Sequence, residues 1–300
     1  MTRVLITGAN GLLGQKLVIT FLEDFDVIAT AREERSVFQS PRFTYRPLDI
    51  TNYRQVHDLL EDVRPDVIIN AAAYTNVDGC EVEKETCWRA NVKAVENLAV
   101  IARRIGSKLV HVSTDYIFDG QNGPYDEDAR PNPLCYYGKA KLASENAVKK
   151  EGIPYIIART SVVYGVGRQV KKNFFLWLYE NLKNGTPIRV VTDQYNTPTL
   201  AEDLAEGILQ ALQSGYEGVI NISGGEFLNR YEMAVQVATY FGFNKEQITP
   251  ITTDQLNQKA TRPLKAGLKI DRAVQTFQFR PRTLTQAMDM MTPYLQEEMA

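Results

Sequence analysis

The sequence predicts an α/β protein built on a doubly wound parallel sheet, with a smaller C-terminal part of mixed α/β structure. Three observations lead to this class. The first half of the 300-residue chain alternates short β-branched apolar runs with longer segments of helical spacing. The apolar runs are continuous, which is typical of parallel strands buried on both faces. A glycine-rich turn joins the first run to the first helical segment, where the chain must reverse tightly.

The elements of the first half follow this alternation along the chain. Strands are expected at Arg3–Thr7, Asp26–Ala31, Thr44–Leu48, Asp66–Ala71, Lys108–Ser113 and Tyr155–Thr160. Helices are expected at Leu12–Glu23, Tyr53–Val63 and Val82–Ile105. Strands that alternate with helices form βαβ units, so these strands should lie parallel in one sheet.

The second half predicts a looser mixture of elements. Strands are expected at Ile188–Val191 and Gly218–Ile222, and helices at Lys171–Lys183, Thr199–Leu212, Asn229–Phe241 and from Thr283 onward. Capping-box spacing marks the start of three of these helices, at Thr199 with Glu202, Asn229 with Glu232, and Thr283 with Gln286.

Charge and cysteine content exclude several classes of protein. Lys and Arg total 34 against 36 Asp and Glu, so the net charge of −2 offers no electrostatic footprint for nucleic acid or an anionic membrane. Cys80, Cys87 and Cys135 form no CxxC or zinc spacing and are expected to be free thiols. No apolar run approaches a membrane span, and an apolar run beginning at Arg3 leaves no room for a signal peptide. We therefore expect a cytoplasmic protein.

The glycine-rich turn has the pattern of a dinucleotide-binding loop. The first strand runs directly into Gly8, Gly11 and Gly14, spaced GxxGxxG, at the start of the first helix. Glycine permits close approach of the backbone to a pyrophosphate, and the helix N-terminus offers N–H groups to phosphates. The sequence therefore predicts a Rossmann domain over residues 1–163. The predicted cofactor contacts in its loop are Gly8, Asn10, Gly11, Leu12, Leu13 and Gly14.

Residues 164–300 form the predicted second part, which binds substrate in such an arrangement. No flexible linker separates it from the first part. We therefore expect it to pack on the first part, with room to return strands or helices to the sheet.

Two other strand ends complete the predicted cofactor site. Where NAD enzymes commonly place an acid against the ribose 2′-hydroxyl, Ala31 is followed by Arg32. A guanidinium suits a 2′-phosphate, so NADP(H) is preferred to NAD(H), although two glutamates follow and weaken that preference. Small side chains at the end of the fourth strand would let a cofactor lie against the backbone, at Ala71, Ala72 and Ala73.

The predicted reaction centre combines a strand end with a short helical motif. Thr114 ends the fifth strand, and Tyr137 and Lys141 are four apart, one turn from each other on a helix. A nearby ammonium and a positive nicotinamide would stabilise the tyrosine phenolate, whose unperturbed pKa is about 10. Carbonyl reduction needs a hydride, which NADPH supplies, and a proton, which Tyr137 can supply while Thr114 orients the carbonyl oxygen.

Other chemistries find no support in the sequence. His57 and His111 are the only histidines, His57 on a predicted helix surface and His111 inside the fifth strand as a packed core residue. They indicate neither a Ser-His-Asp triad nor a histidine-rich metal site. No GxxxxGK[ST] run is present, so a P-loop is not expected.

These segments together resemble the extended short-chain dehydrogenases/reductases, and more closely the dTDP-4-dehydrorhamnose reductase family. The resemblance spans about residues 3 to 290. Its segments are the glycine loop, the runs at 70–75, 113–118, 137–142 and 159–161, Asn173-Phe174, Asp193–Tyr195 with Pro198-Thr199, and Arg262-Pro263.

The resemblance implies reduction of the 4-keto group of a dTDP-linked 6-deoxysugar, the last step of dTDP-L-rhamnose synthesis. It also implies that Asp49 and Ile50 flank the adenine and that Lys141 bonds the nicotinamide ribose. The substrate residues that it implies are Thr75, Val77 and Asp115 beside the sugar, and Asn173, Asp193, Gln194, Tyr195 and Arg262 toward the nucleotide diphosphate.

The chain departs from the family pattern on the substrate side. Val162 stands where many such reductases have a tryptophan that would pack on the sugar ring, which puts the identity of the sugar in doubt. Asn196 replaces a common glycine, and Ala266 replaces a serine. Some relatives form metal-bridged dimers through an early helix carboxylate. The run Gln15–Leu17 has no acid there, so no metal site is expected. A homodimer without such a metal stays compatible with the sequence.

Two alternatives stay open. One is another nucleotide-sugar enzyme of the same superfamily, such as an epimerase. A dehydratase is disfavoured, because those enzymes carry an acidic pair where Asp115 is followed by Tyr116. The other is a regulatory subunit that binds cofactor without turnover, as the β subunit of methionine adenosyltransferase resembles the same family.

Overall fold

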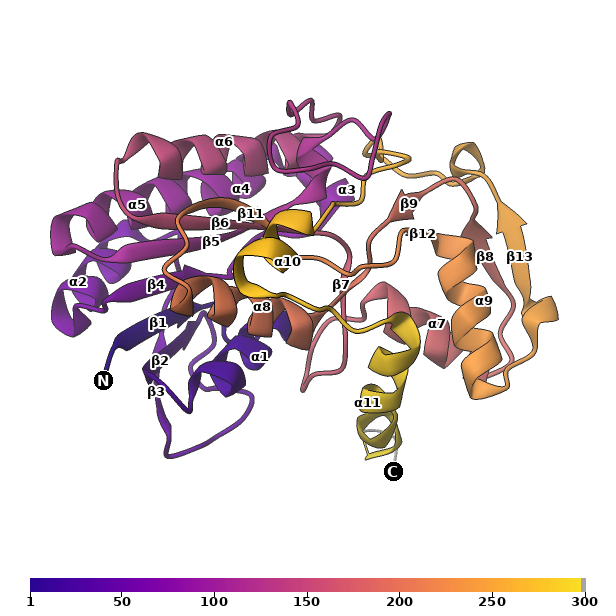
Figure 1. Ribbon diagram of the computed structural model, residues 1–300, viewed down its shortest axis with the longest axis horizontal. Coiled ribbons are helices and arrows are strands. Elements are labelled where there is room, and N and C mark those ends of the chain that lie inside the picture. The colour runs from indigo at the N-terminus through magenta and orange to yellow at the C-terminus, as the bar shows by residue number, and fades with distance from the viewer. Residues whose placement is uncertain (298–300) are drawn as a thin grey trace.

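The computed structural model describes residues 1–297 and contains a seven-stranded parallel sheet flanked by helices (Figure 1). Its strands are β1 Arg3–Thr7, β2 Asp26–Ala31, β3 Phe43–Pro47, β4 Val67–Asn70, β5 Lys108–Thr114, β6 Tyr155–Thr160 and β11 Gly218–Asn221. They stand in the order β11-β6-β5-β4-β1-β2-β3, with every neighbouring pair parallel. The strand order reverses direction between β1 and β4, which confirms the predicted doubly wound class.

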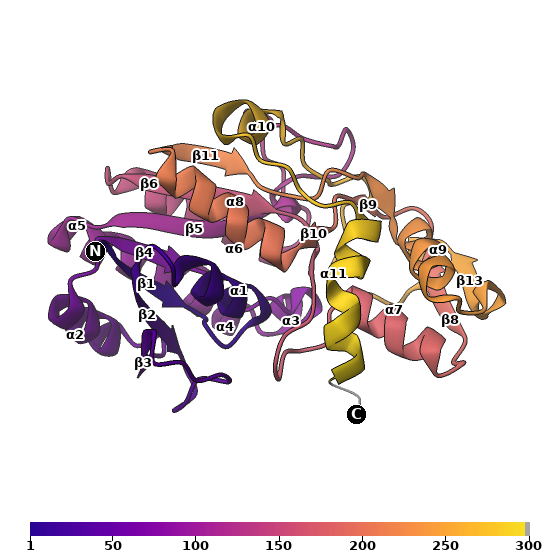
Figure 2. The same ribbon diagram turned by 60° about the horizontal axis from the view of Figure 1, so that its bottom comes forward.

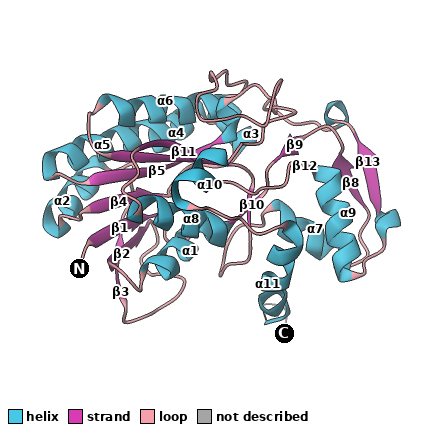
Figure 3. Ribbon diagram, in the orientation of Figure 1, coloured by secondary structure: helices cyan, strands magenta, loops and turns pink. Residues whose placement is uncertain are grey.

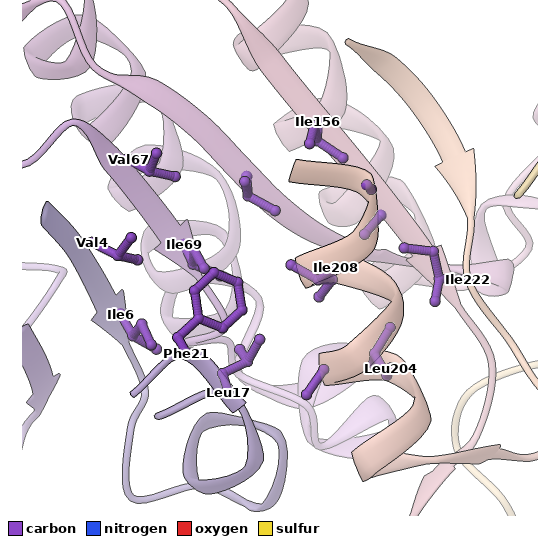
Figure 4. Packing of buried hydrophobic residues seen from close by; sticks show 14 of the residues in the cluster. Val4, Ile6, Leu17, Phe21, Val67, Ile69, Ile156, Leu204, Ile208 and Ile222 are labelled. Atoms are coloured by element: carbon purple, nitrogen blue, oxygen red, sulfur yellow. The ribbon is translucent and has the colours of Figure 1, made fainter. Parts of the chain in front are cut away.

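Helices cover both faces of this sheet (Figure 2). On one face lie α1 Leu12–Phe21 and α8 Ala201–Gln213, and on the other lie α2 Tyr53–Val63, α5 Ala94–Ile105 and α6 Tyr136–Lys150. Figure 4 shows Leu17 and Phe21 of α1 beside Leu204 and Ile208 of α8, over the strands. All four side chains are fully buried. Burial of each stabilises the fold by about 2 kcal/mol.

The predicted single helix over Val82–Ile105 is wrong at its start. The chain forms α3 Val77–Val82 and α4 Lys84–Trp88, then a π-helical turn at Arg89–Lys93 leads into α5. Asn76 caps α3 by accepting from the Gly79 N–H at 2.9 Å, and non-helical backbone at Glu83 separates α3 from α4. These local backbone bonds override the apolar periodicity.

The second part contains α7 Phe174–Lys183, α9 Arg230–Phe241, α11 Leu284–Glu297, and the parallel pair β8 Ile188–Val191 and β13 Ile248–Ile251 (Figure 3). Its apolar cluster is separate from the two clusters of the main sheet and includes Leu178, Met233 and Met288. The Asn229–Glu232 capping box is confirmed at α9. Reciprocal bonds between Thr283 and Gln286 confirm the predicted start of α11.

The predicted cap at Thr199 is wrong. Helix α8 begins at Ala201, and the Thr199 hydroxyl donates to the Ser161 carbonyl at 2.7 Å instead of capping it. Thr199 belongs to the short strand β10 Thr199–Leu200, which pairs with β7 Val163–Tyr164. The remaining short elements are β9 Tyr195–Asn196 paired with β12 Leu228–Asn229, α10 Asp271–Phe277, and the 3₁₀ turns Asp115–Ile117, Lys245–Gln247 and Thr253–Gln255.

The second half of the chain returns to the first sheet. Strand β11 extends the sheet beside β6, and α8 packs on α1. Residues after 164 are therefore divided between the main sheet and the smaller part. The three cysteines are buried free thiols, as expected. Within residues 1–297, no helix combines the length and apolar character needed to cross a bilayer.

Candidate active site

The glycine loop is a tight connection with no room for a side chain at Gly8 or Gly14. Gly8 takes a φ of +71°, and a Cβ there would lie 2.9 Å from the backbone of Ala72. A Cβ on Gly14 would lie 2.0 Å from the Gly8 carbonyl oxygen. Helix α1 starts at Leu12 without a side-chain cap and without acids in its first turn. Its N-terminal N–H groups are thus directed toward the loop, in the arrangement that binds phosphates.

Asn10 connects the glycine loop to the segment after β2. Its amide nitrogen donates to Glu33 Oε2 at 3.0 Å and to the Arg35 carbonyl, and its oxygen accepts from the Val37 N–H. Arg32 is exposed at the end of β2. Asp49 forms a local turn, because its carboxylate accepts from both the N–H and the hydroxyl of Thr51.

The end of β4 lies under the glycine loop. Ala71 and Ala72 are partly buried there, and Ala73 is exposed. The Ala72 N–H donates to the Thr7 hydroxyl at 3.3 Å, which ties the two strand ends together. Small side chains at this place therefore leave the backbone of both strands accessible from one edge of the sheet.

Thr114 and Tyr137 meet at the carboxyl end of β5. Thr114 ends the strand, and its hydroxyl accepts from the Tyr116 N–H at 3.2 Å and lies near the Tyr137 phenol, whose pKa it lowers. A Cβ on Gly138 would lie 2.1 Å from the Tyr116 carbonyl oxygen, so only glycine lets α6 approach this closely. The neighbouring Tyr136 points elsewhere, with its ring 6.2 Å from that of Trp88.

Lys141 lies one turn further along α6 and is buried. Its Nζ donates to the Val112 carbonyl at 2.7 Å and lies 3.1 Å from His111 Nε2. Burial lowers the pKa of Lys141 to about 8, against the opposing effect of Glu145. Glu145 is itself held by two hydrogen bonds from the Arg159 guanidinium, at 2.9 and 2.8 Å.

The surroundings of Tyr137 within the chain raise the pKa of its phenol. Burial raises the pKa of this phenol above its ordinary value, and the charge of Asp115 raises it further, while the Thr114 hydrogen bond lowers it. Lys141 Nζ is engaged with the Val112 carbonyl and with His111. A tyrosine that keeps its proton is suited to donate it.

Asp115 is buried directly after Thr114. Ser161 donates to its Oδ2 at 2.6 Å and Thr114 to its Oδ1 at 3.1 Å. Burial raises the pKa of Asp115 to about 6, although these hydrogen bonds and the charge of Arg230 oppose the rise. The next residue after Ser161 is Val162, whose φ of +42° is a strained value for a β-branched side chain.

Arg230 is a charged side chain near this carboxylate that sequence analysis missed. Its guanidinium carbon lies 4.4 Å from the centre of the Phe174 ring. Within residues 1–297, its buried Nη1 has no hydrogen-bond partner. Arg230 and Arg262 both act electrostatically on Tyr116, so two cations face this side of the site.

Several expected substrate residues are already bound to other protein groups. Arg262 forms a bidentate pair with Asp78, with both N–O distances 2.8 Å. Asp193 accepts from the N–H and hydroxyl of Thr253, and the Gln194 amide donates to that same hydroxyl. The side chains of Asp193 and Gln194 therefore hold residues 253–258 against β9.

The other expected substrate residues differ in their contacts and in their exposure. Asn173 caps α7 by accepting from the Leu176 N–H, and its amide donates to the Gly165 carbonyl. The Tyr195 ring lies 5.5 Å from Phe227. Thr75 is exposed, and Val77 is partly buried at the first position of α3.

His111 is a buried core residue, as expected, and it also makes polar contacts. It is fully buried, but both ring nitrogens face polar groups, Nδ1 toward Asn70 and Nε2 toward Ser144 and Lys141. The alternation of side chains along β5 contained the signal for these polar contacts. His111 and Ser113 share one face of the strand, and both contact α6. Among residues 1–297, no group of three or more His, Cys, Asp or Glu side chains is arranged to hold a metal.

Comparisons with known proteins agree with this arrangement. Residues 1–296 match the family of the RmlD substrate binding domain. The chain is 32% identical to the dTDP-4-dehydrorhamnose reductase of Aggregatibacter actinomycetemcomitans, over 98% of this chain and 99% of that protein. It is 34% identical to methionine adenosyltransferase 2 subunit beta of Xenopus tropicalis, over 84% of this chain and 76% of that protein.

A solved structure gives the same result. The dTDP-4-dehydrorhamnose reductase of Bacillus anthracis, crystallised in complex with NADP, superposes with a TM-score of 0.85 at 30% identity and covers 98% of this chain and 100% of its own. The chain therefore belongs to the RmlD substrate binding domain family, the dTDP-4-dehydrorhamnose reductase family of the extended short-chain dehydrogenases/reductases.

Proposed function

We propose that this protein is an NADPH-dependent reductase that converts dTDP-4-dehydro-L-rhamnose to dTDP-L-rhamnose. The observation that carries the proposal is the meeting of Thr114 and Tyr137 at the carboxyl end of β5, with Lys141 one helical turn away. Parallel α/β sheets bind ligands at this edge. The family membership and the reductase at 32% identity support the same reaction.

The residues of the glycine loop fit a dinucleotide. The absence of side chains at Gly8 and Gly14 and the uncapped start of α1 leave backbone N–H groups for a pyrophosphate. Arg32 would take a 2′-phosphate, which favours NADP(H) over NAD(H). The NADP complex of the Bacillus anthracis relative is consistent with that preference.

The mechanism assigns separate tasks to three side chains. When bound, the nicotinamide cofactor supplies the hydride that reduces the C4 carbon. The Thr114 hydroxyl orients the carbonyl oxygen, and Tyr137 donates its proton to that oxygen. Lys141 then stabilises the phenolate when it carries its charge. The raised pKa of Tyr137 keeps the donor protonated before the reaction.

On the substrate side, Arg230 and Arg262 would face the anionic part of the nucleotide sugar. Arg230 is the better placed, because its Nη1 lacks a partner within the described chain whereas Arg262 is paired with Asp78. Thr75, Val77, Asp115 and Val162 would border the sugar, as the family resemblance implies. The strained backbone at Val162 would give this border a fixed shape.

The loss of NADPH absorbance in the presence of dTDP-4-dehydro-L-rhamnose tests this proposal. Tyr137→Phe should reduce kcat by about 10²- to 10⁴-fold, since it removes the proton donor and little volume. Tyr136→Phe is the matched control and should keep full activity, because that ring faces Trp88. NADPH binding should be retained in both variants. Absence of turnover by a wild-type protein that binds NADPH would overturn the substrate assignment.

A second candidate is a regulatory subunit of methionine adenosyltransferase. The observation that favours it is the 34% identity to methionine adenosyltransferase 2 subunit beta. This function requires a stable complex with a catalytic synthetase subunit, which size-exclusion chromatography of the mixed proteins would detect. Co-elution without turnover of any nucleotide sugar would support this candidate over the reductase.

A further inference from the structure

A chain of buried polar side chains crosses the sheet beneath Lys141. The Thr7 hydroxyl donates to Asn70 Oδ1 at 2.7 Å, and Asn70 Nδ2 lies 3.1 Å from His111 Nδ1. His111 Nε2 lies 2.9 Å from Ser144 Oγ and 3.1 Å from Lys141 Nζ. Thr7, Asn70, His111 and Ser144 are each at most 1% exposed. The chain links the first residues of the glycine loop to the lysine of the reaction centre.

The donors and acceptors of this chain determine where the His111 proton lies. Asn70 uses its oxygen to accept from Thr7, so its amide nitrogen can only donate to Nδ1. Nδ1 must therefore be unprotonated, and a neutral imidazole carries its proton on Nε2. The Ser144 hydroxyl donates its hydrogen to the Lys141 carbonyl at 2.7 Å, so its oxygen is free to accept from Nε2–H.

This tautomer places an N–H donor 3.1 Å from Lys141 Nζ. An ammonium can only donate, so it would meet the Nε2–H as a second donor. A neutral amine has a lone pair and can share that hydrogen with Ser144 Oγ as a second acceptor. The opposite tautomer, with the proton on Nδ1, would leave Nε2 as an acceptor for the ammonium.

We propose that His111 is a positioning residue whose tautomer, held by the Asn70 amide, stabilises the amine form of Lys141 relative to the ammonium in the protein before cofactor binds. The proposal rests on the function given above, because it concerns the lysine of the proposed reductase site. It adds a second level of control to that site, since the Asn70 amide shifts the balance between the amine and the ammonium of Lys141.

The electrostatic surroundings agree with this arrangement. Glu145 on α6 and the Cys87 thiol on α4 favour the charged lysine, but burial outweighs both and lowers the pKa of Lys141 to about 8. Arg159 of β6 compensates the Glu145 carboxylate. Cys80 of α3 and Asp115, after β5, act on Tyr137. Burial is the main cause of a His111 pKa well below its usual range, and it keeps the imidazole neutral.

Asn70→Asp is the informative substitution, because it keeps the size of the side chain and replaces the donor by an acceptor. A carboxylate would accept from Nδ1–H, leaving Nε2 to accept from the ammonium. His111→Gln is the matched background. Glutamine has no imidazole ring, so it cannot move a proton from the side that faces Asn70 to the side that faces Lys141. A direct effect of the new charge on Lys141 would survive in that background, whereas an effect through the tautomer would not.

Nitrogen NMR of the cofactor-free protein, labelled in histidine and lysine, tests the proposal without substrate. The chain has two histidines, so His57→Gln assigns the His111 signals, and Lys141→Arg assigns the lysine. In the wild type, we expect a neutral His111 with its proton on Nε2 from about pH 5 to pH 9. In Asn70→Asp, we expect the His111 proton on Nδ1. We also expect an at least tenfold higher proton affinity of Lys141, which moves its titration upward by about one pH unit. The double variant should show no such increase.

Kinetics provide the second readout. The basic limb of kcat/KM for NADPH should move upward by about one pH unit in Asn70→Asp, because that ratio reports groups of the free enzyme. A wild-type His111 with its proton on Nδ1 would overturn the proposal, as would an equal lysine shift with and without His111. The NMR result stands whether or not the protein reduces dTDP-4-dehydro-L-rhamnose, so failure of the proposed substrate is seen separately.

Discussion

Asp115 is held as a buried carboxyl group next to the reaction centre, and this has a consequence for stability. Its pKa rises from 3.8 to about 6 on folding, so the folded protein binds this proton more tightly than the unfolded chain. The stability that the protonated form contributes is present at low pH and is lost as pH rises through about 6. The charged form should therefore cost about 3 kcal/mol at pH 8.

Asp115→Asn should recover that free energy of unfolding, because it removes the buried charge. Urea unfolding should show the variant about 3 kcal/mol more stable than wild type at pH 8, and most of this gap should vanish by about pH 4. Effects of other titrating groups cancel in the difference between the two proteins. A gap that stays constant with pH would contradict the raised pKa.

Arg230 should contribute to binding of the nucleotide sugar without taking part in chemistry. Arg230→Gln should raise KM and the Kd of dTDP by about 10- to 100-fold with a small change in kcat, since a charge-assisted hydrogen bond contributes about 1.5–3 kcal/mol. Arg230→Lys should restore part of the affinity, because it keeps the charge but loses the planar fork. Calorimetry with dTDP measures both variants, and an unchanged Kd in Arg230→Gln would remove Arg230 from the site.

At the scale of elements, the position of α6 depends on one glycine. Gly138→Ala would place a Cβ 2.1 Å from the Tyr116 carbonyl oxygen and force α6 away from the end of β5. We expect a loss of about 1–3 kcal/mol in stability and a larger relative loss of activity, since Tyr137 moves with the helix. Urea unfolding and steady-state rates measure the two losses. Lys139→Ala, at an exposed neighbouring position, should leave both unchanged.

At the scale of the whole molecule, the two parts of the chain share elements and should unfold together. Strand β11 and helix α8 come from the second half but complete the main sheet and its apolar cluster. A fragment of residues 1–163 would expose Leu17, Phe21 and the open edge of β6. We expect such a fragment to lack a cooperative unfolding transition.

The tryptophans allow this coupling to be measured in the intact chain. Trp88 lies in α4 of the first part and Trp177 in α7 of the second, and the chain has no others. Trp88→Phe and Trp177→Phe leave one fluorescent reporter in each part. Their urea transitions should coincide within error, and two separate midpoints would show that the parts unfold independently.

Local chemistry made much of the fold and of the site predictable. The bounds of β1, β2, β6 and α2 follow from apolar runs and periodicity that depend on neighbours within a few residues. The glycine loop and the Tyr137–Lys141 spacing are equally local, because a tight turn and one helical turn are each encoded by residues close in sequence. The same signals missed α3, joined α4 and α5 into one helix and misplaced the start of α8, where side chains bind distant or irregular backbone.

The sequence by itself determined the fold class, the cofactor loop and the spacing of the reaction-centre residues. Only the tertiary structure decided which partners those residues have. His111 and Asn70 are 41 positions apart, and Arg262 and Asp78 are 184 apart, so no local pattern reports that they pair. The protonation of Lys141 and the availability of Arg230 depend on such pairs, because burial and hydrogen bonding act through space and not along the chain.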